Sequence, residues 1–284
     1  MTGGRSTPPL KASWGPPSGR PAGWYPDSTG LPVERYYDGR AWSDGIRGRF
    51  AEPRGVTPTL DPRAAVGAVA VLLVSLLASR WLVEALLSQR WPILAYTAVS
   101  VIVGYGPSVV WGWWASRRFG TGHPVRDLGL RPKWSDIGWG PVVWLCVLGG
   151  QLLAGLLVVV LDVPFTSNTE GVEGLAHDRT YVISLLVAAV VAAPLVEEVI
   201  FRGVVQRGLR SRWSAPAAIG TQGIVFGLVH VDPVRGAGNV GLVIVLSTVG
   251  VVLGAAVELL GRLPPAMIAH AILNSIALAI VLIR

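Results

Sequence analysis

The chain has 284 residues, of which 51% are hydrophobic and 14% are charged, and its mean hydropathy is positive. This composition excludes an ordinary soluble domain, in which about a quarter of the residues are charged. The formal net charge of +7 does not indicate a nucleic acid partner, because the basic residues gather in the N-terminal segment and in particular loops, as membrane topology requires. We therefore expect most of the chain to lie in a lipid bilayer.

The chain begins with a polar segment rich in glycine and proline, from Met1 to Pro62. This segment lacks the apolar core of a secretory signal, so we expect the N-terminus to be cytoplasmic. Within it we predict a disordered tail at 1–21, a small cytoplasmic module at 22–50 and a linker at 51–63. The membrane domain then occupies 64–284.

The module at 22–50 contains aromatic residues between the turn signals Pro26-Asp27 and Asp38-Gly39. This pattern predicts a small Trp-rich, β-hairpin-like fold, whose rings pack on each other or bind a protein partner. Its motif, W-Y-P-D-x-x-G followed by R-Y-Y-D-G-x-x-W, resembles a short domain of unknown function (DUF2510-like) found in bacterial membrane proteins. The resemblance implies no activity. The aromatic residues are Trp24, Tyr36, Tyr37 and Trp42.

Apolar stretches recur from Ala64 onward. A helix needs about 20 residues to cross the hydrocarbon core of a bilayer, and seven stretches approach or exceed that length. We therefore predict an all-α, polytopic transmembrane bundle of seven spans. The spans are Ala64 to Leu87, Ile93 to Ala115, Ile137 to Leu161, Tyr181 to Phe201, Ala215 to Val231, Val240 to Leu260 and Leu263 to Ile283.

Lysine and arginine distribute unevenly between these spans. The loop from 162 to 179 has four acidic residues against Arg179 alone, which is typical of an external loop. The opposite loops are basic, so we expect a multi-pass protein of the inner (plasma) membrane with an external C-terminus. The basic residues are Arg47, Arg49, Arg54 and Arg63 before the first span, Arg117, Arg118, Arg126, Arg131 and Lys133 after the second, and Arg207, Arg210 and Arg212 after the fourth.

Two adjacent glutamates occur in the fourth span, in the sequence P-L-V-E-E-V-I-F-R. A charged residue inside a span costs about 2.5 to 3.5 kcal/mol on insertion scales, so these residues indicate a function. Glu198 and Arg202 are four residues apart, in the order that favours a helical ion pair. Glu197 points about 100° away and has no obvious local partner. A carboxylate in such an apolar place suits a general base.

Imidazole and amide groups follow in later spans. Phe226 and His230 are four residues apart, as are His270 and Asn274, so the two members of each pair share one helix face. Together with a base, these groups are the types that peptide hydrolysis needs: one to deprotonate water and others to stabilise the oxyanion.

The ordered motifs E-E-x-x-x-R, F-x-x-x-H and H-x-x-x-N resemble the CAAX-prenyl-protease-like and bacteriocin-processing (CPBP, or Abi) family of intramembrane proteases. The likeness covers the catalytic part at about 181–284. It implies that Glu197 activates water, that His230 helps to hold this water, and that His270 and Asn274 stabilise the oxyanion. It also implies that Glu198 and Arg202 form a supporting pair, with Phe226 beside them.

Several alternatives stay open at the level of the sequence. Glu197, His230 and His270 could bind zinc, since Glu and His are zinc ligands, although H-E-x-x-H is absent and no cofactor is required by the motifs. The expected function is an intramembrane endopeptidase that hydrolyses a membrane-associated protein or peptide. The rivals are a non-catalytic scaffold or immunity protein, and a proton-coupled transporter.

One feature of the sequence conflicts with this site. Counting about 1.5 Å per residue, Glu197 lies about 24 Å from the outer end of the fourth predicted span, and His230 about 22 Å from the inner end of the fifth. If both spans simply cross the bilayer, these two residues lie at different depths.

Overall fold

The computed structural model describes residues 21–26, 33–48, 60–170, 172 and 178–283. The chain divides into two compact units, one ending at Pro53 and the other beginning at Arg54. Almost all of the predicted tail at 1–21, and most of the predicted linker at 51–63, lie outside the described residues.

The N-terminal unit is a small antiparallel sheet, which confirms the predicted hairpin-like module and adds a third strand. Strands β1 (Gly23–Pro26), β2 (Val33–Tyr37) and β3 (Trp42–Gly48) pair in the order β1-β2-β3. Asp38 accepts hydrogen bonds from the backbone of Arg40 and Ala41, which fixes the turn between β2 and β3. Tyr37 is buried, and its ring lies 5.1 Å from that of Trp42. The side chain of Trp24 lies outside the described residues.

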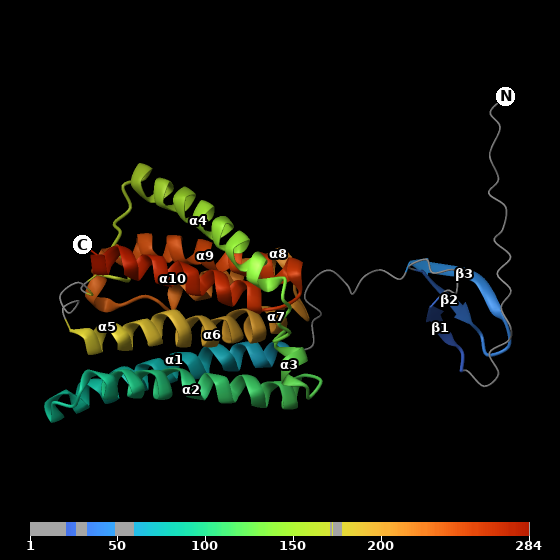
Figure 1. Ribbon diagram of the computed structural model, residues 1–284, viewed down its shortest axis with the longest axis horizontal. Coiled ribbons are helices and arrows are strands. Elements are labelled where there is room, and N and C mark those ends of the chain that lie inside the picture. Colours follow the sequence, from blue (N-terminus) through green and yellow to red (C-terminus); the bar gives the residue numbers. More distant parts are fainter. Residues whose placement is uncertain (1–20, 27–32, 49–59, 171, 173–177, 284) are drawn as a thin grey trace. The chain divides into compact units, whose positions relative to one another are not determined.

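The second unit is a helical bundle (Figure 1). The helices of its first half are α1 (Pro62–Leu86), η1 (Leu87–Gln89), α2 (Ile93–Phe119), α3 (Pro124–Asp127) and α4 (Asp136–Val160). Those of its second half are α5 (Arg179–Leu186), η3 (Val187–Ala192), α6 (Ala193–Glu198), η4 (Val199–Gln206), α7 (Arg207–Arg210), α8 (Ala215–Leu228), η5 (Pro233–Gly238), α9 (Asn239–Leu260) and α10 (Pro264–Ile283). Helices α1 and α2 pack against each other, whereas α4 packs against α9 and α10 of the second half.

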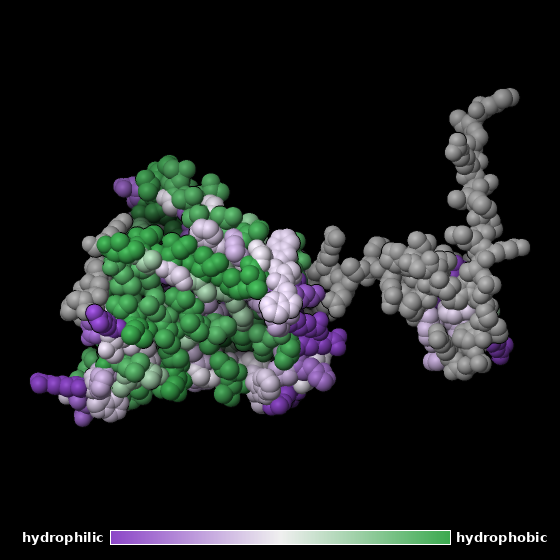
Figure 2. Space-filling model, viewed as in Figure 1, coloured by the Kyte–Doolittle hydropathy of each residue, from purple (hydrophilic) through white to green (hydrophobic). Residues whose placement is uncertain are grey.

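Among the described residues, six helices are long and apolar enough to cross a membrane. An apolar belt covers the flank of the bundle between its polar ends (Figure 2), and many large aliphatic side chains of this belt are exposed. An exposed apolar surface of this kind, on helices long enough to cross a bilayer, is typical of a membrane-facing surface. The predicted all-α membrane bundle is therefore confirmed.

The fifth predicted span, Ala215 to Val231, is too long. Helix α8 has 14 residues and ends at Leu228, which is shorter than the roughly 20 residues that a bilayer requires. The helix could not continue beyond Val231 in any case, because Pro233 disfavours helical backbone angles at the residue before it, Asp232. Asp232 is indeed extended, with φ of −124° and ψ of 124°.

The fourth predicted span, Tyr181 to Phe201, is too short. Helices α5 to α7 form one run of 32 residues from Arg179 to Arg210. The prediction ended early because Arg207, Arg210 and Arg212 are typical of a cytoplasmic loop. Arg207 is nevertheless buried, as is Arg202 just after the predicted end. The run from Ile200 to Gly208 is buried without interruption, so this helix is the centre of the bundle.

Because the helix is longer than predicted, Glu197 and His230 no longer lie at different depths. Glu197 lies about 20 Å from the Arg210 end of the helix at about 1.5 Å per residue. His230 lies about 22 Å from the start of α8, which follows Arg210 after a short turn. The two residues therefore reach the same level of the bundle from the same end.

Main-chain and side-chain hydrogen bonds identify the elements that meet at the end of the bundle that contains Arg210. The start of α1 meets the end of α2, where Asp61 N donates to Phe119 O. Leu263 N, just before α10, donates to Gly129 O, and Arg207 donates to Gly261 O. The predicted basic loops after the second and fourth spans thus lie together. At the opposite end Thr166 N donates to Gly238 O.

Candidate active site

Glu197 lies in α6, between the two π-helical segments η3 and η4, and is buried. π-Helical turns are rare and occur often at functional sites. Its carboxylate accepts a hydrogen bond of 2.7 Å at Oε1 from the phenol of Tyr105 in α2. The second oxygen, Oε2, faces two imidazoles.

His230 and His270 present their Nε2 atoms to that oxygen, at 3.9 Å and 4.0 Å respectively. The Nδ1 atom of His230 lies 2.7 Å from the carbonyl oxygen of Phe226. Since a carbonyl only accepts, Nδ1 carries a proton, and in the neutral ring Nε2 keeps its lone pair. The structure thus brings together Glu197, His230 and His270 from three different helical segments.

Close packing of α8 on α9 places His230 at this level. A Cβ atom on Gly223 would lie 2.9 Å from Val251 N, and one on Gly250 would lie 2.7 Å from the Gly223 Cα atom. Only glycine allows the two backbones to approach so closely, as at many helix contacts in membranes. His230 follows the last turn of α8, immediately beyond this contact.

Glu198 organises the other side of the site. Its Oε1 atom accepts hydrogen bonds of 2.9 Å from Arg202 and from Nδ1 of His270. Glu198 and Arg202 are both fully buried, and Arg202 also donates to the carbonyl of Gly250. The predicted pair therefore forms, and its direct contact is with His270, whereas Glu197 is bonded to Tyr105.

Phe226 packs among the charged groups. Its ring centroid lies 4.7 Å from the guanidinium carbon of Arg202, 4.8 Å from the His230 ring and 5.9 Å from the His270 ring. A guanidinium over an aromatic face is favourable. Phe226 thus fixes the planes of both imidazoles and shields the Arg202 charge.

Asn274 donates a hydrogen bond of 2.7 Å to the carbonyl of Ala189 in η3. That carbonyl needs a partner. In the π-helical register Ala193 N donates to Ala188 O, and the corresponding partner of Ala189 is Pro194, which has no N–H. The amide of Asn274 therefore fastens α10 to the helix that carries Glu197. Its role toward an oxyanion stays a prediction.

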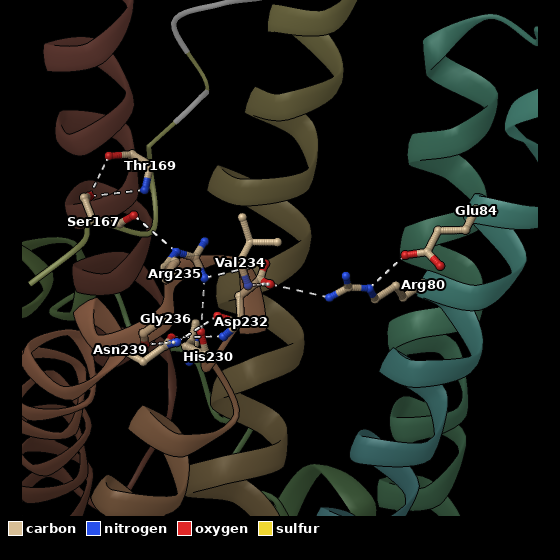
Figure 3. A network of polar contacts seen from close by, with 10 residues as sticks. All are labelled: Arg80, Glu84, Ser167, Thr169, His230, Asp232, Val234, Arg235, Gly236 and Asn239. Carbon is tan, nitrogen blue, oxygen red and sulfur yellow. Dashed lines mark hydrogen bonds and ion pairs between the residues drawn. The ribbon is translucent and has the colours of Figure 1, made fainter.

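A polar network fixes the loop that follows His230 (Figure 3). Asp232 and Asn239 exchange hydrogen bonds, Asp232 N to Asn239 Oδ1 and Asn239 Nδ2 to Asp232 O. Arg235 donates to the carbonyl of His230 and to that of Ser167. Arg80 of α1 reaches toward Asp232, with 3.5 Å between Nη1 and Oδ1. These contacts restrain the backbone of His230.

The Asp232 carboxylate makes this network dependent on pH. A hydrogen bond from Val234 N, together with the charges of Arg235 and Arg80, lowers the pKa of Asp232 below 3.8. A lowered pKa in the folded state stabilises the loop above pH 3.8, and this contribution is lost as the pH falls through the folded pKa. We expect hydrogen exchange at 229–239, corrected for the intrinsic rate, to accelerate below pH 3.8.

Asp232→Asn is the matched control for this pH dependence. Its side-chain oxygen can still accept from Val234 N but does not titrate. Mass spectrometry should therefore find the same corrected exchange in the variant at pH 5 and at pH 3. Equal protection of the wild-type loop at both values would contradict the assignment.

The distances between Glu197 and the two imidazoles are longer than a zinc ion requires. Tetrahedral zinc with ligand bonds of about 2.0 to 2.1 Å places its ligand atoms about 3.3 Å apart, whereas Glu197 Oε2 lies 3.9 and 4.0 Å from the imidazole nitrogens. Within the described residues, no group of three His, Cys, Asp or Glu side chains could hold a metal ion. The arrangement does not fit the zinc site considered from the sequence.

The residue that sequence reasoning missed is Tyr105. It occurs in an apolar stretch, in the sequence V-G-Y-G-P, and the aromatic residues of spans are usually explained by packing or by the membrane interface. The only signal was a phenol well inside an apolar stretch, since a buried Tyr hydroxyl normally finds a partner.

Comparison with known protein families agrees with the motifs. Residues 179–276 match the family described as type II CAAX prenyl endopeptidase Rce1-like, and residues 22–58 match DUF2510, a family of unknown function. No curated protein and no solved structure matches the chain. Both predicted resemblances are confirmed: the chain carries an Rce1-like segment of the CAAX-protease-like family after an N-terminal DUF2510 segment. The Rce1-like segment contains every candidate residue except Tyr105.

Proposed function

We propose that this membrane protein of the CAAX-protease-like family is an intramembrane endopeptidase, in which Glu197 activates a water molecule. The observation that carries the proposal is the convergence of Glu197 Oε2 with the Nε2 atoms of His230 and His270 at about 4 Å. A water molecule bonded to Oε2 can also reach either imidazole, since hydrogen bonds of about 2.8 Å span such separations.

In the proposed mechanism His270 carries a proton on each ring nitrogen, and its Nδ1–H is directed to Glu198. Glu197, Glu198 and Arg202 together carry one negative charge, and an uncompensated charge in an apolar interior is costly. A proton shared with His270, whose Nδ1 already faces Glu198, makes the cluster neutral. In this mechanism His230 directs its Nδ1–H to the carbonyl of Phe226, and its Nε2 accepts a hydrogen bond.

In this mechanism the two imidazoles act differently. Oε2 of Glu197 takes a proton from water while Nε2 of His230 accepts the other hydrogen bond and orients the oxygen. The oxygen attacks the peptide carbonyl, and the N–H of His270 at Nε2 stabilises the negative charge that develops there. Glu197 then returns its proton to the leaving amine as the C–N bond breaks.

We further propose that the basic end of the bundle is cytoplasmic in an inner (plasma) membrane. Lysine and arginine mark cytoplasmic loops, and the opposite end carries acidic residues such as Asp162 and Glu170. The N-terminal module then lies in the cytoplasm, where it can bind a protein partner. The substrate is a membrane-associated protein or peptide.

The test is hydrolysis of membrane-associated peptides by the purified protein in liposomes. We expect the wild type to cleave an internal peptide bond, and His230→Ala to lower kcat about 100-fold, within the range for loss of a group that positions a proton transfer. Assays with and without a chelator test whether peptide cleavage depends on zinc. Unchanged kcat in His230→Ala would refute the mechanism, and the absence of cleavage from a broad peptide library would refute the function.

A further inference from the structure

Tyr105 is the one described residue that donates a hydrogen bond to Glu197, and it lies outside the matched segment 179–276. It comes from α2, which packs against both α1 and the helix that carries Glu197. The family motifs do not include this position. The catalytic base of the proposed reaction is thus oriented by the N-terminal half of the bundle.

Helix α2 is itself held firmly at this point. Small side chains line its contact with α1, and the hydroxyl of Ser75 donates a hydrogen bond of 2.7 Å to the carbonyl of Gly104. Gly104 is buried, and a Cβ atom there would meet Leu76 and Ser79 at 3.5 Å. The residue just before Tyr105 is therefore packed and bonded, which places the phenol reproducibly.

The hydrogen bond makes the two oxygens of Glu197 unequal. Oε1 accepts from Tyr105 at 2.7 Å, and Oε2 faces the imidazoles of His230 and His270. Without the phenol, rotation about the last side-chain bond would turn the carboxylate plane away from them, since that torsion is broad. With it, a single oxygen is directed to the place where water must be deprotonated.

We propose that Tyr105 is a positioning residue of the proposed peptidase: its phenol fixes the Glu197 carboxylate so that Oε2 alone serves as the base. This inference rests on the proposed function. A purely structural link between α2 and α6 would instead contribute to stability and leave turnover unchanged.

Tyr105→Phe removes one oxygen and keeps the ring. Helix α2 offers a matched control, because the Tyr96 phenol donates to the carbonyl of Leu86 and accepts from Trp91 N, away from Glu197. We expect Tyr105→Phe to lower kcat about 10- to 100-fold with KM unchanged, since small errors in orientation have effects of this size. Tyr96→Phe should stay within about twofold of the wild type.

A double-variant cycle separates positioning from folding. In Glu197→Asp the shortened carboxylate no longer reaches the phenol, so adding Tyr105→Phe should lower kcat by less than about twofold more. A full additional loss, equal to that in the wild-type background, would overturn the proposal. So would a Tyr105→Phe enzyme that turns over as fast as Tyr96→Phe.

A second measurement does not depend on hydrolysis. A hydrophobic carbodiimide reacts with a carboxyl oxygen, and an oxygen that accepts a hydrogen bond is less free to attack it. We expect labelling of Glu197, located by tandem mass spectrometry, to be at least about threefold faster in Tyr105→Phe than in Tyr96→Phe. If the labelling changes while the wild type cleaves no peptide, the proposed function fails and the contact is established. Equal labelling overturns the inference.

Discussion

Replacement of Glu197 by glutamine is expected to lower kcat for peptide hydrolysis by about 10²- to 10⁴-fold, with little change in KM. The amide has nearly the shape of the carboxylate and still offers an oxygen to Tyr105, but it cannot take a proton from water. General-base catalysis contributes an effect of this size. The measurement is steady-state cleavage of a membrane-associated peptide by purified protein in liposomes.

Glu258→Gln is the control for this experiment. Glu258 is another carboxylate within a span. It lies near the C-terminal end of α9, away from the site, and accepts hydrogen bonds from Arg210 and Gln206. Its replacement should leave kcat within about threefold of the wild type, since it touches no reacting group. A Glu197→Gln enzyme with more than a tenth of wild-type activity would show that another group is the base.

Arg202→Met should destabilise the helical bundle by about 3 to 5 kcal/mol, because it leaves Glu198 buried without its guanidinium partner. Both members of this pair are fully buried, and Arg202 also donates to Gly250 O in α9. The loss is measured as the free energy of unfolding in mixed detergent micelles. Activity should fall as well, since Glu198 orients His270.

The chain contains a matched exposed pair. Arg80 and Glu84 are also four residues apart in one helix, with 2.9 Å between their charged atoms, but both are more than half exposed. Arg80→Met should therefore cost no more than about 1 kcal/mol, the usual range for an exposed ion pair. If the two substitutions had equal effects, the buried pair would contribute nothing beyond a surface interaction.

The sequence predicted the bundle because its spans are long apolar stretches, whose positions depend on composition alone. It also indicated the candidate residues, because charged or polar side chains such as those of Glu197, His230 and His270 are costly in lipid and are therefore rare in spans. The end of α8 could not be predicted in this way. The apolar stretch continues to Val231, whereas the helix ends at Leu228, four residues before Asp232, whose backbone is extended.

The remaining features depend on contacts between distant segments. A pattern with 3.6 residues per turn cannot reveal the π-helical segments beside Glu197, because a π-helical turn changes the direction of every following side chain. Nothing local in α2 indicates that the phenol of Tyr105 meets a carboxylate. Likewise, Arg207 looks like a loop residue until the surrounding helices are known to enclose it.

The uninterrupted burial from Ile200 to Gly208 has a consequence for biogenesis. When this helix is first inserted, α1 and α2 can already pack against its C-terminal third, but α8 and α9 are not yet present, and each arginine placed in hydrocarbon would cost about 2.5 to 3.5 kcal/mol. The segment therefore gains its final depth only with α9, because the carbonyl of Gly250 in α9 accepts from Arg202 and that of Gly261, just after α9, accepts from Arg207. Because α9 is synthesised later, the candidate site is completed after most of the chain has entered the membrane.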